Sequence, residues 1–257
     1  MSPDALAQRF VDARAAGSGL AVLEGFHALK HALRFGADVE LVVASDPHEL
    51  ERMADELAPD LVGRLAALAH PVAAERLARL APRAPRTQVL SIARRPPFDS
   101  ARVRDGDGPD GPRPIVLLED PRDLGNVGAV VRVAAAADAA GVVTTGTHDP
   151  WDPAALRGSA GLHYALPVGR DDAFDPAPRP LLALDPDGDL LDPAALPPNA
   201  VLAFGTERHG LSEALLARAD GRLRIPMRTG VSSLNLATSV SAVLFSWRLA
   251  IHPFDDV

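Results

Sequence analysis

PIVLLEDPRDLGNVGAVVRVAAAADAAGVVTTG, residues 114–146, changes its hydrophobic pattern twice. The run 114–120 is a short apolar segment typical of a buried strand, and 126–140 has the alanine- and valine-rich composition of a closely packed helix. Gly141 ends that helix, and 141–146 is again a strand. A strand, a helix and a strand at this spacing indicate a parallel sheet covered by helices.

The same alternation continues to the C-terminus. Apolar runs predict strands at 162–168, 180–186, 201–205 and 223–227, and helical patterns cover 152–161, 212–220 and 233–251. We therefore predict an α/β domain over residues 114–257, built on a mostly parallel sheet.

Residues 1–93 predict a separate, small α/β domain. Residues 21–36 have the pattern of an amphipathic helix closed by Gly36, and buried strands are expected at 39–45 and 89–94. Residues 94–113 are rich in proline, glycine and charge, which is typical of a linker between domains.

The composition excludes several classes of protein. The 257 residues include no cysteine, so disulfides, thiolate nucleophiles and cysteine-ligated metal sites are excluded. No secretory signal or membrane span is recognisable, and we expect a cytoplasmic protein. The formal net charge of −8 argues against indiscriminate RNA binding. Residues 76–104, however, hold eight arginines and a single acid, Asp99.

That arginine strip has two interpretations. It is either a solvated linker or a set of phosphate contacts, and for the second the candidates are Arg83, Arg86, Arg94 and Arg95.

Ligands of parallel α/β sheets bind beyond the carboxyl ends of the strands, which directs attention to the loops after 120, 205 and 227. In the first loop, Gly125 and Gly128 flank Asn126, so we expect exposed backbone N–H groups at a helix start. Arg132 follows Gly128 by one turn and is expected to lean back over it, toward a phosphate or an oxyanion. A dinucleotide fingerprint fits poorly, since Asp123 occupies the position of its first glycine.

Three segments in order resemble the motifs of the SpoU/TrmH family, within the SPOUT class of RNA methyltransferases. They are NVGAVVR (126–132), FGTERHGLS (204–212) and IPMRTGVSSLN (225–235). The segment RGSAGLHYALPV (157–168) also resembles the stretch between them. The resemblance covers about 114–252, and the N-terminal domain more loosely resembles the ribosomal-protein-like RNA-binding domain of many members.

The resemblance implies a sheet with a C-terminal deep trefoil knot, which pattern reading alone would not predict. It implies S-adenosylmethionine held largely by backbone groups, at positions matching Gly205, Ile225 and Leu234. It assigns catalysis to five positions, which here are Asn126, Arg132, Glu207, Ser233 and Asn235. Arg132 is either the base for the ribose hydroxyl or a clamp for a phosphate and the developing alkoxide. No metal is expected.

The predicted function is 2′-O-methylation of structured RNA, with ribosomal RNA ahead of transfer RNA. The alternatives are a catalytically silent RNA-binding protein that keeps the knot, and a nucleotide-dependent oxidoreductase. The family forms dimers through its last helix, and an apolar stripe there predicts a homodimer, although burial within one subunit must account for part of it. The stripe consists of Leu236, Val240, Val243, Leu244, Trp247 and Ile251.

Overall fold

The structure is a computed structural model that describes residues 2–82, 84–106, 111–206 and 209–251. The chain forms two compact units. The first comprises Met1–Pro97 and Ala160–Ala165, and the second comprises Phe98–Ser159 and Leu166–Val257. Among the described residues, every helix is too short or too polar to cross a membrane.

The first unit is built on a four-stranded sheet in the order β1-β4-β2-β3. β4 is antiparallel to both β1 and β2, whereas β3 is parallel to β2. Leu6 and Phe10 of the first helix pack on Leu41 and Ile92 of the sheet, and all four are buried. The elements are α1 (Pro3–Arg14), β1 (Leu20–Glu24), α2 (Phe26–Arg34), β2 (Val39–Ala44), α3 (Pro47–Leu57), α4 (Val62–Leu68), β3 (Ala69–Pro71), α5 (Ala74–Leu77) and β4 (Val89–Arg94).

The helix predicted for residues 21–36 is wrong in its first half. Residues 20–24 form β1, which pairs with β4, and only 26–34 are helical. Gly25 separates the two elements with a φ of 95°, a conformation that glycine adopts without strain. The apolar run LAVLE fits a strand whose two faces are both covered, a pattern that helical periodicity does not distinguish over so short a segment.

The second unit contains a six-stranded sheet in the order β10-β8-β9-β5-β6-β7, and every neighbouring pair is parallel. This confirms the predicted α/β class. The elements are α6 (Ser100–Asp105), β5 (Ile115–Leu118), α7 (Leu124–Ala136), β6 (Gly141–Thr144), α8 (Pro153–Ser159), β7 (Val168–Arg170), β8 (Leu181–Leu190), β9 (Val201–Phe204), α9 (Glu213–Arg218), β10 (Gly221–Arg224) and α10 (Leu236–Ile251).

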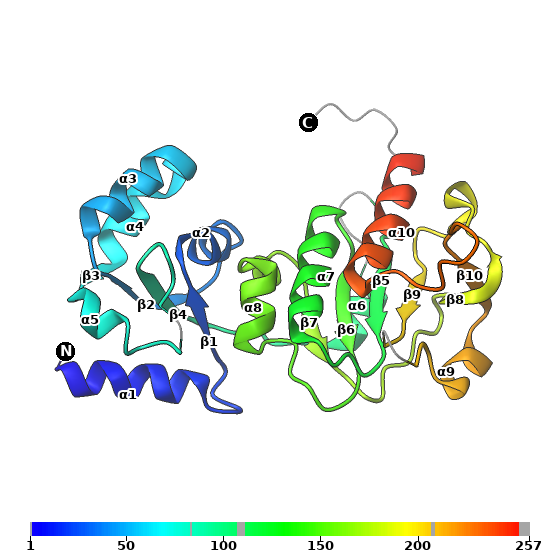
Figure 1. The fold of residues 1–257 in the computed structure, drawn as a ribbon, viewed down its shortest axis with the longest axis horizontal. Helices are drawn as coiled ribbons and strands as arrows, with labels where there is room; N and C mark the ends of the chain where they lie inside the picture. Colours follow the sequence, from blue (N-terminus) through cyan, green and yellow to red (C-terminus); the bar gives the residue numbers. More distant parts are fainter. Residues whose placement is uncertain (1, 83, 107–110, 207–208, 252–257) are drawn as a thin grey trace. The chain divides into compact units, whose positions relative to one another are not determined.

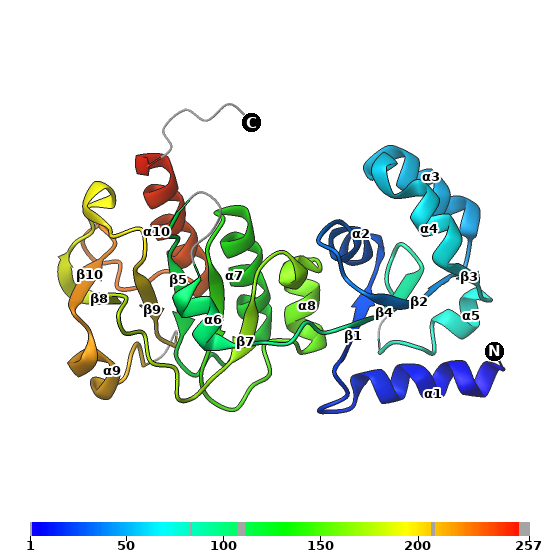
Figure 2. The same ribbon diagram turned by 180° about the vertical axis from the view of Figure 1, so that it is seen from behind.

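Helices cover both faces of this sheet. Figure 1 shows α7 and α10 side by side in front of the strands, and Figure 2 shows α6 on the opposite side. Val103 of α6 and Leu215 of α9 share one buried cluster with Ile115 and Val143 of the central strands. The carboxyl ends of β5 and β9, which are hydrogen-bonded neighbours, therefore open at the same edge of the sheet.

Several predicted boundaries in this half differ from the structure. The strand predicted at 223–227 is found at Gly221–Arg224, and the one predicted at 180–186 runs over Leu181–Leu190. Residues 162–168 are not a strand: Gly161, at φ 80°, begins a short 3-10 turn over Leu162–Tyr164, and β7 starts only at Val168. The last helix begins at Leu236 rather than at 233. Asn235 caps it, since its Oδ1 accepts from the N–H groups of Ala237 at 3.0 Å and Thr238 at 3.3 Å.

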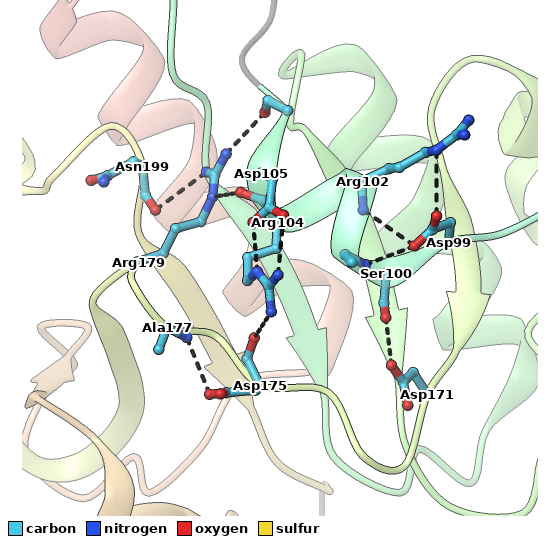
Figure 3. Close-up of polar contacts among 12 residues, drawn as sticks. Asp99, Ser100, Arg102, Arg104, Asp105, Asp171, Asp175, Ala177, Arg179 and Asn199 are labelled. Carbon is cyan, nitrogen blue, oxygen red and sulfur yellow. Dashed lines mark hydrogen bonds and ion pairs between the residues drawn. The ribbon is translucent and has the colours of Figure 1, made fainter.

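Residues 94–113, expected to be a linker, complete β4 and contain α6. Asp99 caps α6 through the N–H groups of Ala101 and Arg102, and Val103 is buried. The nearly buried guanidinium of Arg179 then ties the end of α6 to the rest of the unit (Figure 3). It donates to the carbonyl oxygens of Arg104, Gly106 (3.0 Å), Arg113 (2.9 Å) and Asn199 (3.3 Å).

Candidate active site

Asn126 lies in the first turn of α7, directly beyond the carboxyl end of β5. The helix is capped by Asp123, whose Oδ1 accepts from the backbone N–H of Asn126 at 3.0 Å. A carboxylate at this position also stabilises the positive end of the helix dipole. The backbone of Asn126 is thereby fixed at the edge of the sheet where ligands of such folds bind.

Asn126 and Asn235 form a direct hydrogen bond, although 109 residues separate them in the sequence. Nδ2 of Asn235 donates to Oδ1 of Asn126 at 3.0 Å. Because Oδ1 of Asn235 already accepts the first N–H groups of α10, its amide nitrogen is the atom left to face Asn126. The first and third motifs thus meet at two of the predicted catalytic residues.

A cavity of about 360 Å³ lies beside these residues. Four of the predicted site residues line it, namely Gly205, Ile225, Ser233 and Leu234. Its other walls are largely apolar, with the remaining described lining residues being Leu184, Asp185, Pro186, Phe204, Thr206, Gly210, Leu223, Arg224, Met227, Ser232, Leu236 and Ser239. The volume is within the range of small-molecule sites, about 300–1,000 Å³.

Position 205 must be a glycine because the backbone of Gly210 packs directly against it. Thr206 and Gly210 exchange two backbone hydrogen bonds of 3.0 Å, which closes a tight loop after β9. A Cβ on Gly205 would lie 2.0 Å from the carbonyl carbon of Gly210. A larger residue would therefore displace this loop, and with it one wall of the cavity.

A second, larger cavity of about 1,030 Å³ shares Thr206 and Gly210 with the first. Asn126 lines it, together with the carboxylates of Glu119, Asp120 and Asp123. The other described lining residues are Arg122, Leu124, Gly125, Ala154, His209, Leu211 and Ser212. Glu119 is held in place, because both of its oxygens accept from Ser212, from the N–H and from the hydroxyl, at 2.6 Å each. The two cavities adjoin at the loop after β9.

The surroundings of Arg132 differ from the prediction at Gly128. Gly128 faces α8, where a Cβ would lie 2.1 Å from the carbonyl oxygen of Ala155, so this glycine serves close helix packing and is not open to a ligand. Arg132 is exposed on α7 and is not among the described residues that line either cavity. Within the part of the chain that the structure describes, its guanidinium has no acid or acceptor in bonding distance, so it is available to an external anion.

The remaining predicted residues divide into three groups. Glu207 and Arg83 lie outside the described residues. Arg94 is paired with Asp38 at 3.2 Å and Glu40 at 2.6 Å, and Arg95 donates to the carbonyl oxygen of Leu20 at 2.7 Å. Arg86 is exposed.

Sequence reasoning missed Asp123 and Glu119 as organisers of the site. Asp123 stands three residues before Asn126, the spacing of a helix cap, and this signal was present in the sequence. Nothing local marked Glu119, since its partner Ser212 is 93 residues away.

Part of the chain matches the model of a known protein family, and nearly the whole chain resembles solved structures. The model of the SpoU rRNA Methylase family matches residues 113–245. The chain is 33% identical over 170 residues to a 23S rRNA (adenosine(1067)-2′-O)-methyltransferase of Streptomyces laurentii, and the match covers 61% of this chain and 60% of that protein. It is 36% identical over 148 residues to a tRNA (cytidine(34)-2′-O)-methyltransferase of Burkholderia pseudomallei, covering 52% of this chain and 94% of that protein.

Among solved structures, the fold is similar to the SpoU methyltransferase AviRb from Streptomyces viridochromogenes in complex with AdoMet. The TM-score is 0.73 at 23% identity, over 95% of this chain and 97% of that one. The similarity therefore extends to both units.

Proposed function

The chain belongs to the SpoU rRNA Methylase family, and we propose that it is an S-adenosylmethionine-dependent 2′-O-methyltransferase of structured RNA. One observation carries the proposal: a hydrogen bond joins Asn126, which lines the larger cavity, to Asn235, whose chain neighbours Leu234 and Leu236 line the smaller one. The relatives described above are named for methylation of ribosomal or transfer RNA. We place ribosomal RNA first because the chain carries an N-terminal unit that could select a large RNA.

The smaller cavity fits the cofactor. Adenine needs hydrogen-bond partners within an apolar slot. Backbone groups around Gly205 and Leu234 would supply them, between the apolar side chains of Ile225 and Phe204 that also line the cavity. When bound there, S-adenosylmethionine would supply an electrophilic methyl group on sulfur. Ser233 and Asn126 would then orient the ribose hydroxyl toward it from the side of the larger cavity.

Arg132 would act outside the cavities. Its exposed guanidinium is suited to a phosphate next to the target ribose, which it would bind as a planar fork. We assign it this positioning role rather than that of a base, because free guanidinium does not deprotonate near neutral pH.

The family knot is part of the same proposal. The segment 225–235 and the loop after Gly205 line one cavity, as they would if the C-terminal segment threaded through that loop.

The first unit would bind RNA. Among its exposed arginines Arg76, Arg79 and Arg86 have no ion pair within the described residues, so we expect phosphate contacts there rather than at Arg94. Replacing Arg86 with Gln should lower the slope of log RNA affinity against log salt concentration by about one unit. An unchanged slope would exclude a phosphate contact at Arg86.

Titration calorimetry tests the cofactor assignment. We expect S-adenosylmethionine to bind without added metal and NAD not to bind. Gly205→Val should abolish binding, because the new side chain displaces the loop that walls the cavity. Binding of NAD alone would instead support the oxidoreductase.

A further inference from the structure

β8 is interrupted beside the smaller cavity. Ala183 pairs with Arg222 of β10, but the next pair joins Asp189 to Leu223, so the intervening residues 184–188 have no partner on β10. They form a bulge, and Leu184, Asp185 and Pro186 within it line the cavity. Bulges next to functional sites often change the direction in which a side chain points.

The bulge is held in one conformation. Gly188 lies so close to β10 that a Cβ would be 2.5 Å from the carbonyl carbon of Arg222 and 2.6 Å from the nitrogen of Leu223. The backbone N–H of Asp187 donates to Oδ1 of Asp185 at 2.9 Å. The carboxylate of Asp185 is therefore oriented by its own loop.

The charge of this carboxylate is poorly compensated. Its side chain is only 12% exposed, yet the cation paired with it among the described residues, Nη1 of Arg222, is 3.7 Å away on a side chain that is 47% exposed. Arg224 is the other charged side chain among the described residues that line the smaller cavity. A ligand that covers Asp185 removes its remaining water, which is costly unless the ligand supplies an opposite charge.

We propose that Asp185 is a specificity residue that recognises the positive charge on the methionine part of the cofactor. The proposal rests on the function proposed above. S-adenosylmethionine carries two cationic groups, the sulfonium and the α-ammonium, whereas the ribose hydroxyls and adenine are neutral. The desolvated carboxylate favours either cation over the neutral groups.

Calorimetry with three ligands tests this without RNA. S-adenosylmethionine has both cations, S-adenosylhomocysteine keeps only the ammonium, and 5′-methylthioadenosine has neither. The variant is Asp185→Asn, which keeps an oxygen to accept from Asp187 and so preserves the bulge. Asp187→Asn is the matched control, since it removes the same charge from the same bulge at an exposed residue outside the cavity lining.

We expect Asp185→Asn to weaken S-adenosylmethionine binding by about 10-fold or more, as for loss of a charged hydrogen bond. Binding of 5′-methylthioadenosine should remain unchanged, which also shows that the cavity is intact. The control variant should bind all three ligands like the wild type. If binding of S-adenosylhomocysteine is also weakened, the partner of Asp185 is the α-ammonium group. If its binding is unchanged, the partner is the sulfonium. Both results support the proposal.

Equal weakening of all three ligands would overturn the proposal, because the carboxylate would then serve the ribose or the fold. No weakening of any ligand would overturn it as well. If the wild type bound none of the three, the cofactor assignment itself would fail, and this inference with it.

Discussion

At the scale of single residues, the same side chains cap helices and build the site. The side-chain oxygen of Asn235 caps the N-terminus of α10, and its side-chain nitrogen donates a hydrogen bond to Asn126. Asp123 caps α7 and fixes the backbone of Asn126. The site is therefore pre-organised by helix termini, whose positions depend on the packing of the whole second unit.

Two substitutions at Asn235 separate capping from site geometry. Asn235→Asp keeps the cap but cannot donate to Asn126, so the free energy of unfolding should change by less than about 0.5 kcal/mol while methyl transfer falls about 10-fold or more. Asn235→Ala should lose activity and also about 1 kcal/mol of stability. Urea unfolding and a methyl-transfer assay check both, and full activity of the Asp variant would show that the bond to Asn126 is dispensable.

The residues of the site were predictable only where a motif carried them. Asn126 and Asn235 come from separate motifs, and the structure places them in contact. Gly205, Ile225, Ser233 and Leu234 likewise share a cavity. The open surroundings expected at Gly128 were mispredicted, because helical spacing does not reveal that α8 packs there.

At the scale of elements, α7 and α8 pack unusually closely through their glycines. Gly128 of α7 contacts the backbone of Ala155, and a Cβ on Gly158 of α8 would lie 2.8 Å from the carbonyl oxygen of Gly125. This contact positions the first turn of α7, which carries Asn126.

Gly128→Ala should therefore destabilise the protein, by about 1–3 kcal/mol, because the added methyl group forces the two helices apart. Gly63→Ala in α4 makes the same chemical change where a Cβ meets no atom within 4 Å, and it should stabilise by about 0.5–1 kcal/mol. Thermal unfolding of the two variants provides the comparison. If Gly128→Ala left the stability unchanged, the two helices would be able to separate at little cost in free energy.

Short apolar segments were predictable as strands where they alternate with clear helical patterns, as at β5, β6 and β9. Elsewhere they were not. β1 and the turn at Leu162–Tyr164 were assigned to the wrong class, because five to seven apolar residues fit either period. The bulge in β8 also escaped prediction, since it depends on the register against β10, a strand that lies some 30 residues later.

At the scale of the whole molecule, the exposed side chains of the last helix bear on the predicted homodimer. Five residues of the predicted dimer stripe are buried within the chain itself: Leu236, Val240, Val243, Leu244 and Trp247. They pack inward because α10 lies against α7 (Figure 1) and against the 3-10 turn Pro193–Ala195. The apolar side chains left exposed on α10 are Phe245 (37%), Leu249 (65%) and Ile251 (40%), and we propose these for the homodimer.

Light scattering at micromolar protein should give twice the chain mass of 27.0 kDa. Leu249→Glu should reduce it to the mass of one chain, because a carboxylate cannot be buried in an apolar interface without a partner. Val11→Glu, at a similarly exposed apolar residue of α1, should leave the dimer intact. A monomeric wild type would contradict the proposal.

In the proposed function, the protein transfers a methyl group from S-adenosylmethionine in the smaller cavity to a ribose held at the larger one. Purified protein should be incubated with S-adenosylmethionine labelled in its methyl group and with ribosomal and transfer RNA in separate reactions, followed by digestion and mass spectrometry of the nucleosides. We predict label in a 2′-O-methylated nucleoside, greater with ribosomal RNA, and its loss in Arg132→Ala despite unchanged cofactor affinity. Label on a base, or no transfer to any RNA by a protein that binds the cofactor, would contradict the proposed function.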